Sequence, residues 1–526
     1  MKERPVSSLE APPPDGTVTL ARNVASRYLA IGVETGLGLL MLPFNVAHLG
    51  QAGYGLWMLA ASVTAYFSIL DLGYGGSIVR FVAHYRARKD VGALNEVLST
   101  TAAIFAAMGI VAYGVGAAAA FGLEYLFALS PDELATGRTV LLILAVNVSA
   151  GLVFSVFGGV VNGFQRYDLN NLVGVVTSVV AALVNVVVLW SGYGLVTLVG
   201  ATTAVRLIGY ALYRMNAYRV FPELHLAWAL VSRARLRELT GFSVYMSISD
   251  WAAKLNYSVD ALVVGAFLGP AAVAVWSVAQ RITDAVMRLT NQLNDMMFPA
   301  IVGHASSRRT DRLAVILIEA TRLSLATALP VGIGVGVLAE PLITAWVGPT
   351  FHQSVLVLQL LMVTVVVRVA VATAITLLRG AGHHKLVALT NAGAAVANLA
   401  LSVTLVRYLS YAGVALGTIV PIAVAGLLIV LPTACRRVGV PVAVAVRQAI
   451  LPPLWPGLLV AGALLAVRGR VGGALVGTVA LLGAGVVGYL LLFVFVALDT
   501  DERRRYMARW HALRSRTRLQ PVAEGA

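Results

Sequence analysis

Fourteen continuous apolar stretches, each about 20 residues long, constrain the fold of this chain more than any other feature. A helix needs about 20 mostly apolar residues to cross a bilayer. Hydrophobic residues make up 59% of the chain, and a soluble protein lacks the polar surface to cover so many. The stretches lie at residues 28–48, 54–76, 98–121, 139–162, 170–190, 195–214, 240–264, 271–299, 315–338, 354–378, 386–406, 413–433, 449–467 and 474–497. Because they do not alternate with polar residues, they predict an all-α polytopic membrane protein and not a barrel.

The distribution of positive charge predicts the orientation of the chain. Of the 39 Lys and Arg residues, 29 lie in the two ends and one set of alternate connections, and four lie in the other set. Positive residues concentrate on the cytoplasmic side, so both termini are expected to be cytoplasmic. The net charge of +15 is spread between apolar stretches, which indicates anionic membrane lipids and not nucleic acid as partners.

A repeat at one constant offset indicates two similar halves. A shift of 219 residues pairs Gly50 with Gly269 and Trp57 with Trp276. Parallel repeats are a recurring plan of membrane transporters, with the substrate path between the halves. The expected regions are a cytoplasmic tail (1–27), a six-helix bundle (28–214), a cytoplasmic linker (215–239), a second six-helix bundle (240–434), two additional helices (435–498) and a basic cytoplasmic tail (499–526).

Several short motifs resemble a known superfamily. They are Leu49–Trp57, Leu70–Gly73, Val79–Ala83, Gly163–Tyr167 and Leu262–Gly269. Together they look like the polysaccharide-biosynthesis branch of the multidrug/oligosaccharidyl-lipid/polysaccharide (MOP) flippase superfamily, to which the Wzx-type O-antigen flippases belong. The resemblance covers residues 20–435 and identifies the superfamily more firmly than the substrate.

The resemblance implies a fold, a substrate and partners. The fold is two pseudo-symmetric, MATE-like bundles that open alternately to each side of a bacterial-type inner membrane. The substrate is a polyprenyl-diphosphate-linked oligosaccharide for surface polysaccharide such as lipopolysaccharide, with polymerase and assembly proteins as candidate partners. A cation-coupled multidrug exporter and a lipid II flippase stay open as alternatives. Lipid II flippases carry arginine within the first span, where this chain has Glu34.

Ionisable and amide side chains inside the apolar stretches are the candidate site residues, because charges at membrane depth usually face a cavity or a partner. The candidates for binding substrate are Arg281, Arg288, Lys254, Arg368, Asn291, Arg206 and Arg322. The candidates for a coupling ion or a salt bridge are Glu34, Asp250, Asp260, Asp284, Asp295 and Asp71. Arginine binds two phosphate oxygens at once, which suits a diphosphate.

Each candidate also has a purely structural interpretation. Asp284 pairs with Arg281 or Arg288 in that interpretation, and Asp71 makes a helix-end contact. Arg206 and Arg322 extend to a membrane surface from the ends of their spans. Glu34 is the one charge within the first span, which favours a site for H⁺ or Na⁺ coupling.

Several classes of function lack support in the sequence. The single cysteine excludes a disulfide within the chain, and no Cys/His cluster has metal-ligand spacing. No GxxxxGK[ST] motif indicates direct use of ATP. No connection on the outer side is long enough to gather catalytic groups, so an enzyme is not expected and no cofactor is predicted.

Overall fold

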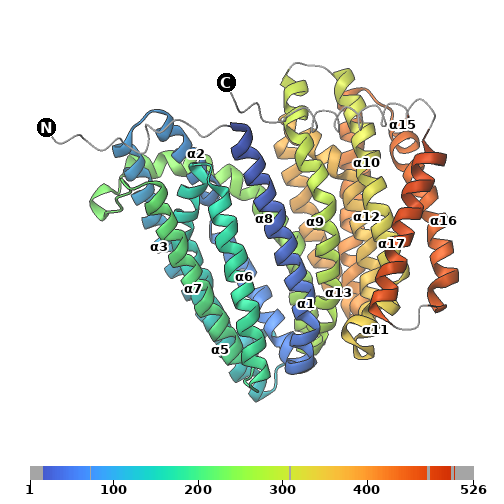
Figure 1. Cartoon of the computed structure of the whole chain (residues 1–526), viewed down its shortest axis with the longest axis horizontal. Helices are drawn as coiled ribbons and strands as arrows, with labels where there is room; N and C mark the ends of the chain where they lie inside the picture. Colours follow the sequence, from blue (N-terminus) through green and yellow to red (C-terminus); the bar gives the residue numbers. More distant parts are fainter. Residues whose placement is uncertain (1–15, 72, 307–309, 471–473, 499–502, 504–526) are drawn as a thin grey trace, which may run out of the picture. The chain divides into compact units, whose positions relative to one another are not determined.

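The computed structural model describes the backbone of residues 16–71, 73–306, 310–470, 474–498 and 503. All of its regular elements in these ranges are helices (Figure 1). Four predicted site residues have side chains outside the described part, namely Asp250, Lys254, Asn291 and Asp295.

The chain forms two compact units whose boundaries fall inside helices α9 (Pro270–Ser306) and α13 (His384–Ala423). Unit 1 comprises residues 1–281 and 391–418, and unit 2 comprises residues 282–390 and 419–526. The other main helices of unit 1 are α1 (Gly16–Ala65), α2 (Tyr74–Ala87), α3 (Val91–Phe121), α4 (Leu123–Leu126), α5 (Pro131–Gly163), α6 (Tyr167–Trp190), α7 (Leu195–Val220) and α8 (Arg233–Leu268). Those of unit 2 are α10 (Thr310–Val337), α11 (Ala339–Val347), α12 (Gln353–Gly380), α14 (Leu431–Val438), α15 (Val442–Ala445), α16 (Leu451–Val467) and α17 (Leu475–Leu492).

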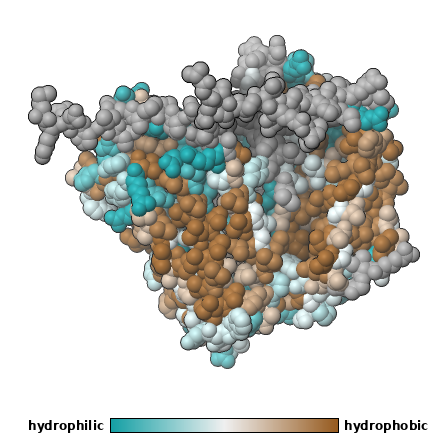
Figure 2. Space-filling model, viewed as in Figure 1, coloured by the Kyte–Doolittle hydropathy of each residue, from teal (hydrophilic) through white to brown (hydrophobic). Residues whose placement is uncertain are grey.

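Ten helices among the described residues are long and apolar enough to cross a membrane. Two of them, Arg22–Ala65 and His384–Val438, have 44 and 55 residues, about twice the length that one crossing needs. Apolar side chains cover the middle of the unit 1 helices that face the viewer in Figure 2, with hydrophilic ones toward the ends. The chain is therefore a multi-pass helical membrane protein, while the count of fourteen spans stays a prediction.

The first long helix is bent at Gly50, one of the repeated positions. Gly50 has φ 69° and ψ 175°, and Gly269, which ends α8, has φ 86° and ψ 174°. This region of backbone conformation is open essentially to glycine. The same conformation at both positions is what a duplicated unit requires, and the proposal of a duplication gains support from it.

The expected span 54–76 is not one continuous helix. α1 ends at Ala65, a 3₁₀ turn covers Tyr66–Asp71, and α2 starts at Tyr74. The Oδ1 atom of Asp71 accepts a hydrogen bond from the backbone N–H of Gly75 at 3.0 Å. Asp71 thus bonds a backbone N–H in the first turn of α2 that has no partner within the helix. This is the helix-end contact that the structural interpretation of Asp71 expected.

The linker between α7 and α8 is held along α3 by side chains. The Nδ2 of Asn95 donates to the Glu223 carbonyl, and the Asn95 Oδ1 accepts from the His225 N–H, both at 2.9 Å. Further along, the Thr100 hydroxyl accepts from the Ser232 N–H at 3.1 Å. These bonds satisfy linker backbone groups that are not in a helix, so the linker is an ordered part of unit 1.

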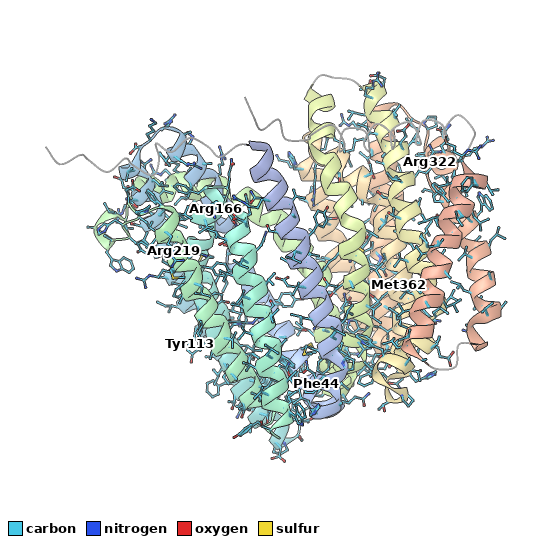
Figure 3. The ribbon with its side chains drawn as sticks, viewed as in Figure 1. Phe44, Tyr113, Arg166, Arg219, Arg322 and Met362 are labelled. Carbon is cyan, nitrogen blue, oxygen red and sulfur yellow. The ribbon has the colours of Figure 1, made fainter. Side chains whose placement is uncertain are left out.

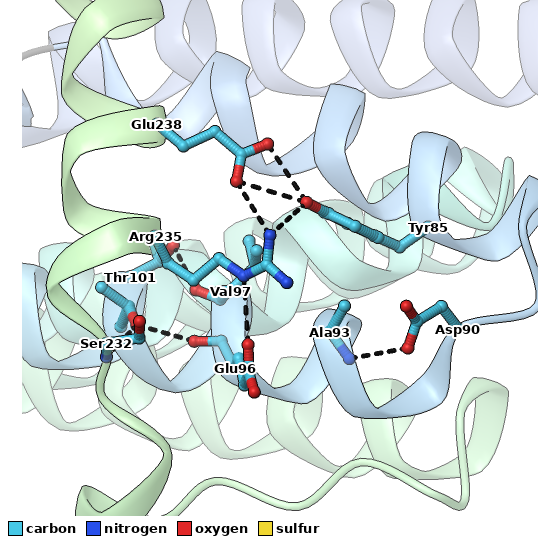
Figure 4. Close-up of polar contacts among 10 residues, drawn as sticks. Tyr85, Asp90, Ala93, Glu96, Val97, Thr101, Ser232, Arg235 and Glu238 are labelled. Atoms are coloured by element: carbon cyan, nitrogen blue, oxygen red, sulfur yellow. Dashed lines mark hydrogen bonds and ion pairs between the residues drawn. The ribbon is translucent and has the colours of Figure 1, made fainter.

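The start of α8 is fixed by an arginine, shown in Figure 4. Arg235 donates to Glu96 at 3.1 Å, to the Tyr85 hydroxyl at 2.7 Å and to Glu238 at 3.1 Å. Burial raises the pKa of the Tyr85 phenol, and its hydrogen bond to Glu238 raises it further. Burial alone would lower the pKa of Arg235, but its bonds to Glu238 and Glu96 outweigh burial and raise it. Tyr85 therefore stays neutral and Arg235 stays charged at physiological pH.

Replacing Arg235 by alanine should destabilise unit 1 by about 1–2 kcal/mol, because it leaves Glu96 and Tyr85 without a charged donor. The group is partly exposed, so solvent screening keeps the effect at this level. Resistance of the purified protein to unfolding by sodium dodecyl sulfate measures it. Arg233→Ala is the matched control, since Arg233 is exposed on the same turn. Equal resistance of the two variants would contradict the assigned role.

The two C-terminal helices that lie outside the predicted duplication pack within unit 2. Helices α16 and α17 both contact α10, which also packs against α12. The Tyr489 hydroxyl of α17 donates to the Pro453 carbonyl of α16 at 2.7 Å. This buried bond links α17 to the first turn of α16.

Candidate functional site

A cavity of about 420 Å³ in unit 1 brings together residues of α1, α2, α5, α6 and α7. Among the lining residues within the described part of the chain, Glu34 of α1 is the only charged one. The other polar side chains are neutral, namely Ser155, Asn162, Asn170, Asn171, Tyr210 and Tyr213. Five of the lining residues are glycines, Gly75, Gly151, Gly158, Gly159 and Gly174. The cavity is therefore a polar pocket inside a bundle of apolar helices.

The side chains of Glu34 and Tyr213 both lie close to Gly174 of α6. A β-carbon on Gly174 would lie 3.7 Å from both the Glu34 Oε1 atom and the Tyr213 hydroxyl. Arg206 of α7 lies close enough to act electrostatically on the same tyrosine as Glu34 does. The Arg206 side chain is exposed, and it is not among the described residues that line the cavity.

Amides organise the α5–α6 wall of this cavity. The Nδ2 of Asn170 donates to the Gly158 carbonyl at 2.9 Å and to the Asn162 Oδ1 at 2.8 Å. The Oδ1 of Asn170 is buried without a hydrogen-bond partner in the described part of the chain. Glycines let the helices approach here, since a β-carbon on Gly159 would lie 2.6 Å from Ile78 of α2.

A second polar cluster in unit 1 surrounds Asp260 of α8. The Asp260 side chain is only 4% exposed, although it lies in an expected membrane span. Its Oδ2 accepts a hydrogen bond from the Thr418 hydroxyl at 2.9 Å. Asn398 and Ser402 of α13 are also buried, and the Ser402 hydroxyl donates to the Asn398 Oδ1 at 2.9 Å.

The bend of α13 brings the members of this Asp260 cluster together. Ser410 has φ 51° and ψ −131°, so the helix reverses there and residues 411–423 return beside residues 391–409. The return is tight, because a β-carbon on Gly417 would lie 2.7 Å from the backbone nitrogen of Ser402. The Thr418 hydroxyl then lies 3.4 Å from the Asn398 Oδ1. Four oxygen-bearing side chains thus share one buried site.

The predicted arginines are distributed over both units. Arg281 of unit 1 forms a hydrogen bond with the buried Tyr54 hydroxyl. In unit 2, Arg288 is exposed, whereas Asp284 and Arg368 are half-buried. Arg322, labelled in Figure 3, is only 7% exposed, so it does not extend to a membrane surface as the structural interpretation expected.

The sequence pattern pointed to charged residues and missed their neutral neighbours. Asn398 and Ser402 are four residues apart in an expected span, which puts them on one helix face. Asn170 and Asn171 form an adjacent amide pair at the start of another span. Polar residues at such spacing in an apolar helix were the available signal, although serine and asparagine are common enough in membrane helices to weaken it.

Comparison with known families decides the relationship. Residues 20–303, more than half of the chain, match the model of the family described as "Polysaccharide biosynthesis protein". The chain belongs to the polysaccharide biosynthesis protein family.

A curated relative supports the placement in the polysaccharide biosynthesis protein family. The chain is 26% identical over 340 residues to a Haloferax volcanii protein described as "Probable flippase AglR". The match covers 63% of this chain and 65% of the relative, slightly under two thirds of its length. The predicted resemblance to this branch of the MOP superfamily is therefore confirmed.

Solved structures show that this family member has the fold of MOP superfamily transporters. The lipid II flippase MurJ in an inward closed conformation aligns with a TM-score of 0.70 at 12% identity, covering 90% of this chain and 97% of MurJ. An inward-facing MATE family multidrug resistance transporter aligns with a TM-score of 0.64 at 15% identity, covering 78% of this chain and 94% of that one. At these identities, the comparison establishes the predicted MATE-like fold alone.

Proposed function

We propose that this chain is a flippase that moves a lipid-linked oligosaccharide from the inner to the outer leaflet by alternating access. The observation that carries the proposal is the polar cavity of unit 1 within helices of membrane length. A sugar headgroup cannot cross hydrocarbon unaided, because each unpaired polar group costs several kcal/mol there. A polar pocket inside a bundle of the polysaccharide biosynthesis family lowers that barrier.

The substrate of this proposal is a polyprenyl-diphosphate-linked glycan for surface polysaccharide. The diphosphate is assigned to arginines of the expected spans, with Arg281 and Arg288 as the first candidates. Anionic lipids and polysaccharide polymerase or assembly proteins are the proposed partners. The proposed location is a bacterial-type inner membrane with both termini in the cytoplasm, as the charge distribution indicates.

The proposed coupling residue is Asp260. A buried carboxylate costs free energy unless it is protonated, paired or bound to a cation. The Thr418 hydroxyl is within hydrogen-bonding distance of both the Asp260 carboxylate and the Asn398 Oδ1, and this group of oxygens suits either a proton or a hard cation such as Na⁺. Glu34 is exposed in an open cavity and lacks this enclosure, so we place coupling at Asp260.

Loss of either arginine should stop export. Arg281→Ala and Arg288→Ala are each expected to lower surface polysaccharide by at least about tenfold, because a diphosphate loses a bidentate, charge-assisted partner. Staining of surface polysaccharide in a strain that carries each variant measures this. Arg281→Lys keeps the positive charge but lacks the planar guanidinium that binds two phosphate oxygens at once. This variant should therefore export more polysaccharide than Arg281→Ala and less than the wild-type protein.

The control variant is Arg233→Ala, which replaces an exposed arginine of the predicted linker. Immunoblots of membrane fractions check that each variant is present at the normal level. The control should export normally. Normal polysaccharide in both arginine variants, at normal protein level, would remove the assignment of the diphosphate to these residues.

A further inference from the structure

The cavity of unit 1 differs chemically from a site for a diphosphate. Glu34 is the only charged residue of the lining that the structure describes, and a carboxylate repels phosphate. Arg206 lies outside the described lining, which itself carries no excess of positive charge. A diphosphate needs such an excess, so the ligand that fits the cavity is electrically neutral or dipolar.

The neutral lining offers hydrogen bonds of both kinds. Asn and Tyr side chains donate and accept, and a carboxylate accepts only. The Tyr210 hydroxyl donates to the Asn147 Oδ1 at 3.1 Å, which leaves its oxygen free to accept from a ligand. A compound with many hydroxyls matches this set of groups.

The shape of the cavity suits a ring with one apolar face. The rings of Phe154 and Tyr210 lie 6.0 Å apart and 20° from parallel, and both residues line the cavity. Five of the described lining residues are glycines, so backbone forms part of the cavity wall. A volume of about 420 Å³ falls within the range of small-molecule sites and holds one or two sugar rings.

We propose that the Glu34 cavity binds a neutral sugar residue of the substrate glycan, while the diphosphate binds elsewhere. The inference rests on the proposed flippase function and divides the recognition of its substrate. Glu34 and Tyr213 hydrogen-bond sugar hydroxyls on the two sides of Gly174. The aromatic pair contacts the apolar face of the ring, as polar and apolar groups combine in small-molecule sites.

The test uses the purified full-length chain and two kinds of probe. The first is a panel of neutral disaccharides (maltose, lactose, cellobiose and N,N′-diacetylchitobiose), and the second is inorganic pyrophosphate. Binding is measured by saturation-transfer NMR. Gly174→Val adds methyl groups between Glu34 and Tyr213, where the β-carbon itself meets only ordinary contacts at 3.7 Å. Gly200→Val on α7 is the matched control, because a β-carbon there meets nothing within 4 Å.

The wild-type chain and Gly200→Val should bind at least one disaccharide, and Gly174→Val should bind it at least about tenfold more weakly. Glu34→Gln, which keeps the shape of the side chain, should also weaken the binding of that disaccharide. Pyrophosphate binding should be equal in all four proteins. Wild-type-like sugar binding by Gly174→Val, or binding of no disaccharide by the wild-type chain, would overturn the inference. If the proposed flippase function itself is wrong, the wild-type protein will not translocate a lipid-linked glycan. That result is distinct from a loss of disaccharide binding in the variants.

Discussion

Replacing Asp260 by asparagine is expected to lower transport by between about fivefold and about 150-fold, the usual range of a coupling free energy between two sites. Asparagine keeps the shape and still accepts the hydrogen bond from Thr418, so unit 1 should fold normally. It cannot take up a proton or balance the charge of a cation. Transport by the variant should therefore no longer depend on external pH or Na⁺, which a titration of each in reconstituted vesicles measures.

The control for this variant is Asp132→Asn, an exposed acid in the first turn of α5. It should transport at the wild-type rate with the wild-type ion dependence. Thr418→Val removes the hydroxyl of the same cluster and should give an intermediate loss, because Asp260 keeps its charge. Transport by the Asp260 variant that equals the control and still responds to the ion would exclude Asp260 as the coupling residue.

Gly55→Ala should destabilise unit 1 by at least about 3 kcal/mol, the upper part of the range for overpacking. The β-carbon of this alanine would run into the backbone carbonyl oxygen of Pro270, where α9 begins. A backbone group cannot move aside as a flexible side chain does, so two helices must separate. The measurement is the yield of folded protein after detergent extraction, together with Tm.

Gly53→Ala is the matched control two residues earlier in the same helix. Its β-carbon meets only the Leu49 β-carbon, at 3.4 Å. Alanine favours the helix over glycine, so this variant should be as stable as the wild-type chain or slightly more. A Gly55 variant as stable as the Gly53 variant would show that α1 and the start of α9 do not pack as closely as described.

The helical elements were predictable from the sequence, because membrane spans follow from length and hydrophobicity alone. Apart from the break after Ala65, each expected stretch is helical over nearly all of its length, although some combine α-helical and π-helical segments. That break depends on the Asp71 carboxylate bonding to the Gly75 N–H, and an apolar window does not report such a bond. The bend at Ser410 was predictable, because it falls in the short connection at residues 407–412 between the expected spans 386–406 and 413–433.

The candidate site was predictable in part. Glu34 and Asp260 stood out because a charge in an apolar span is costly, and each lies in a polar cluster of unit 1. Their neutral partners, such as Asn398 and Asn170, did not stand out, because amides are only moderately costly in a helix bundle. Which of them meet depends on the bend of α13 and on the glycine contacts of α5, and helical spacing alone does not specify either.

The central claim is that this chain carries the polar head of a lipid-linked glycan across a bilayer. The most direct measurement reconstitutes the purified protein in sealed vesicles that contain a polyprenyl-diphosphate oligosaccharide in both leaflets. A glycosidase added outside cleaves only the glycans of the outer leaflet. With the wild-type chain, the inner-leaflet glycans should become cleavable over time, and with Asp260→Asn they should stay largely protected. Equal protection of the inner-leaflet pool with and without the wild-type protein would contradict the account.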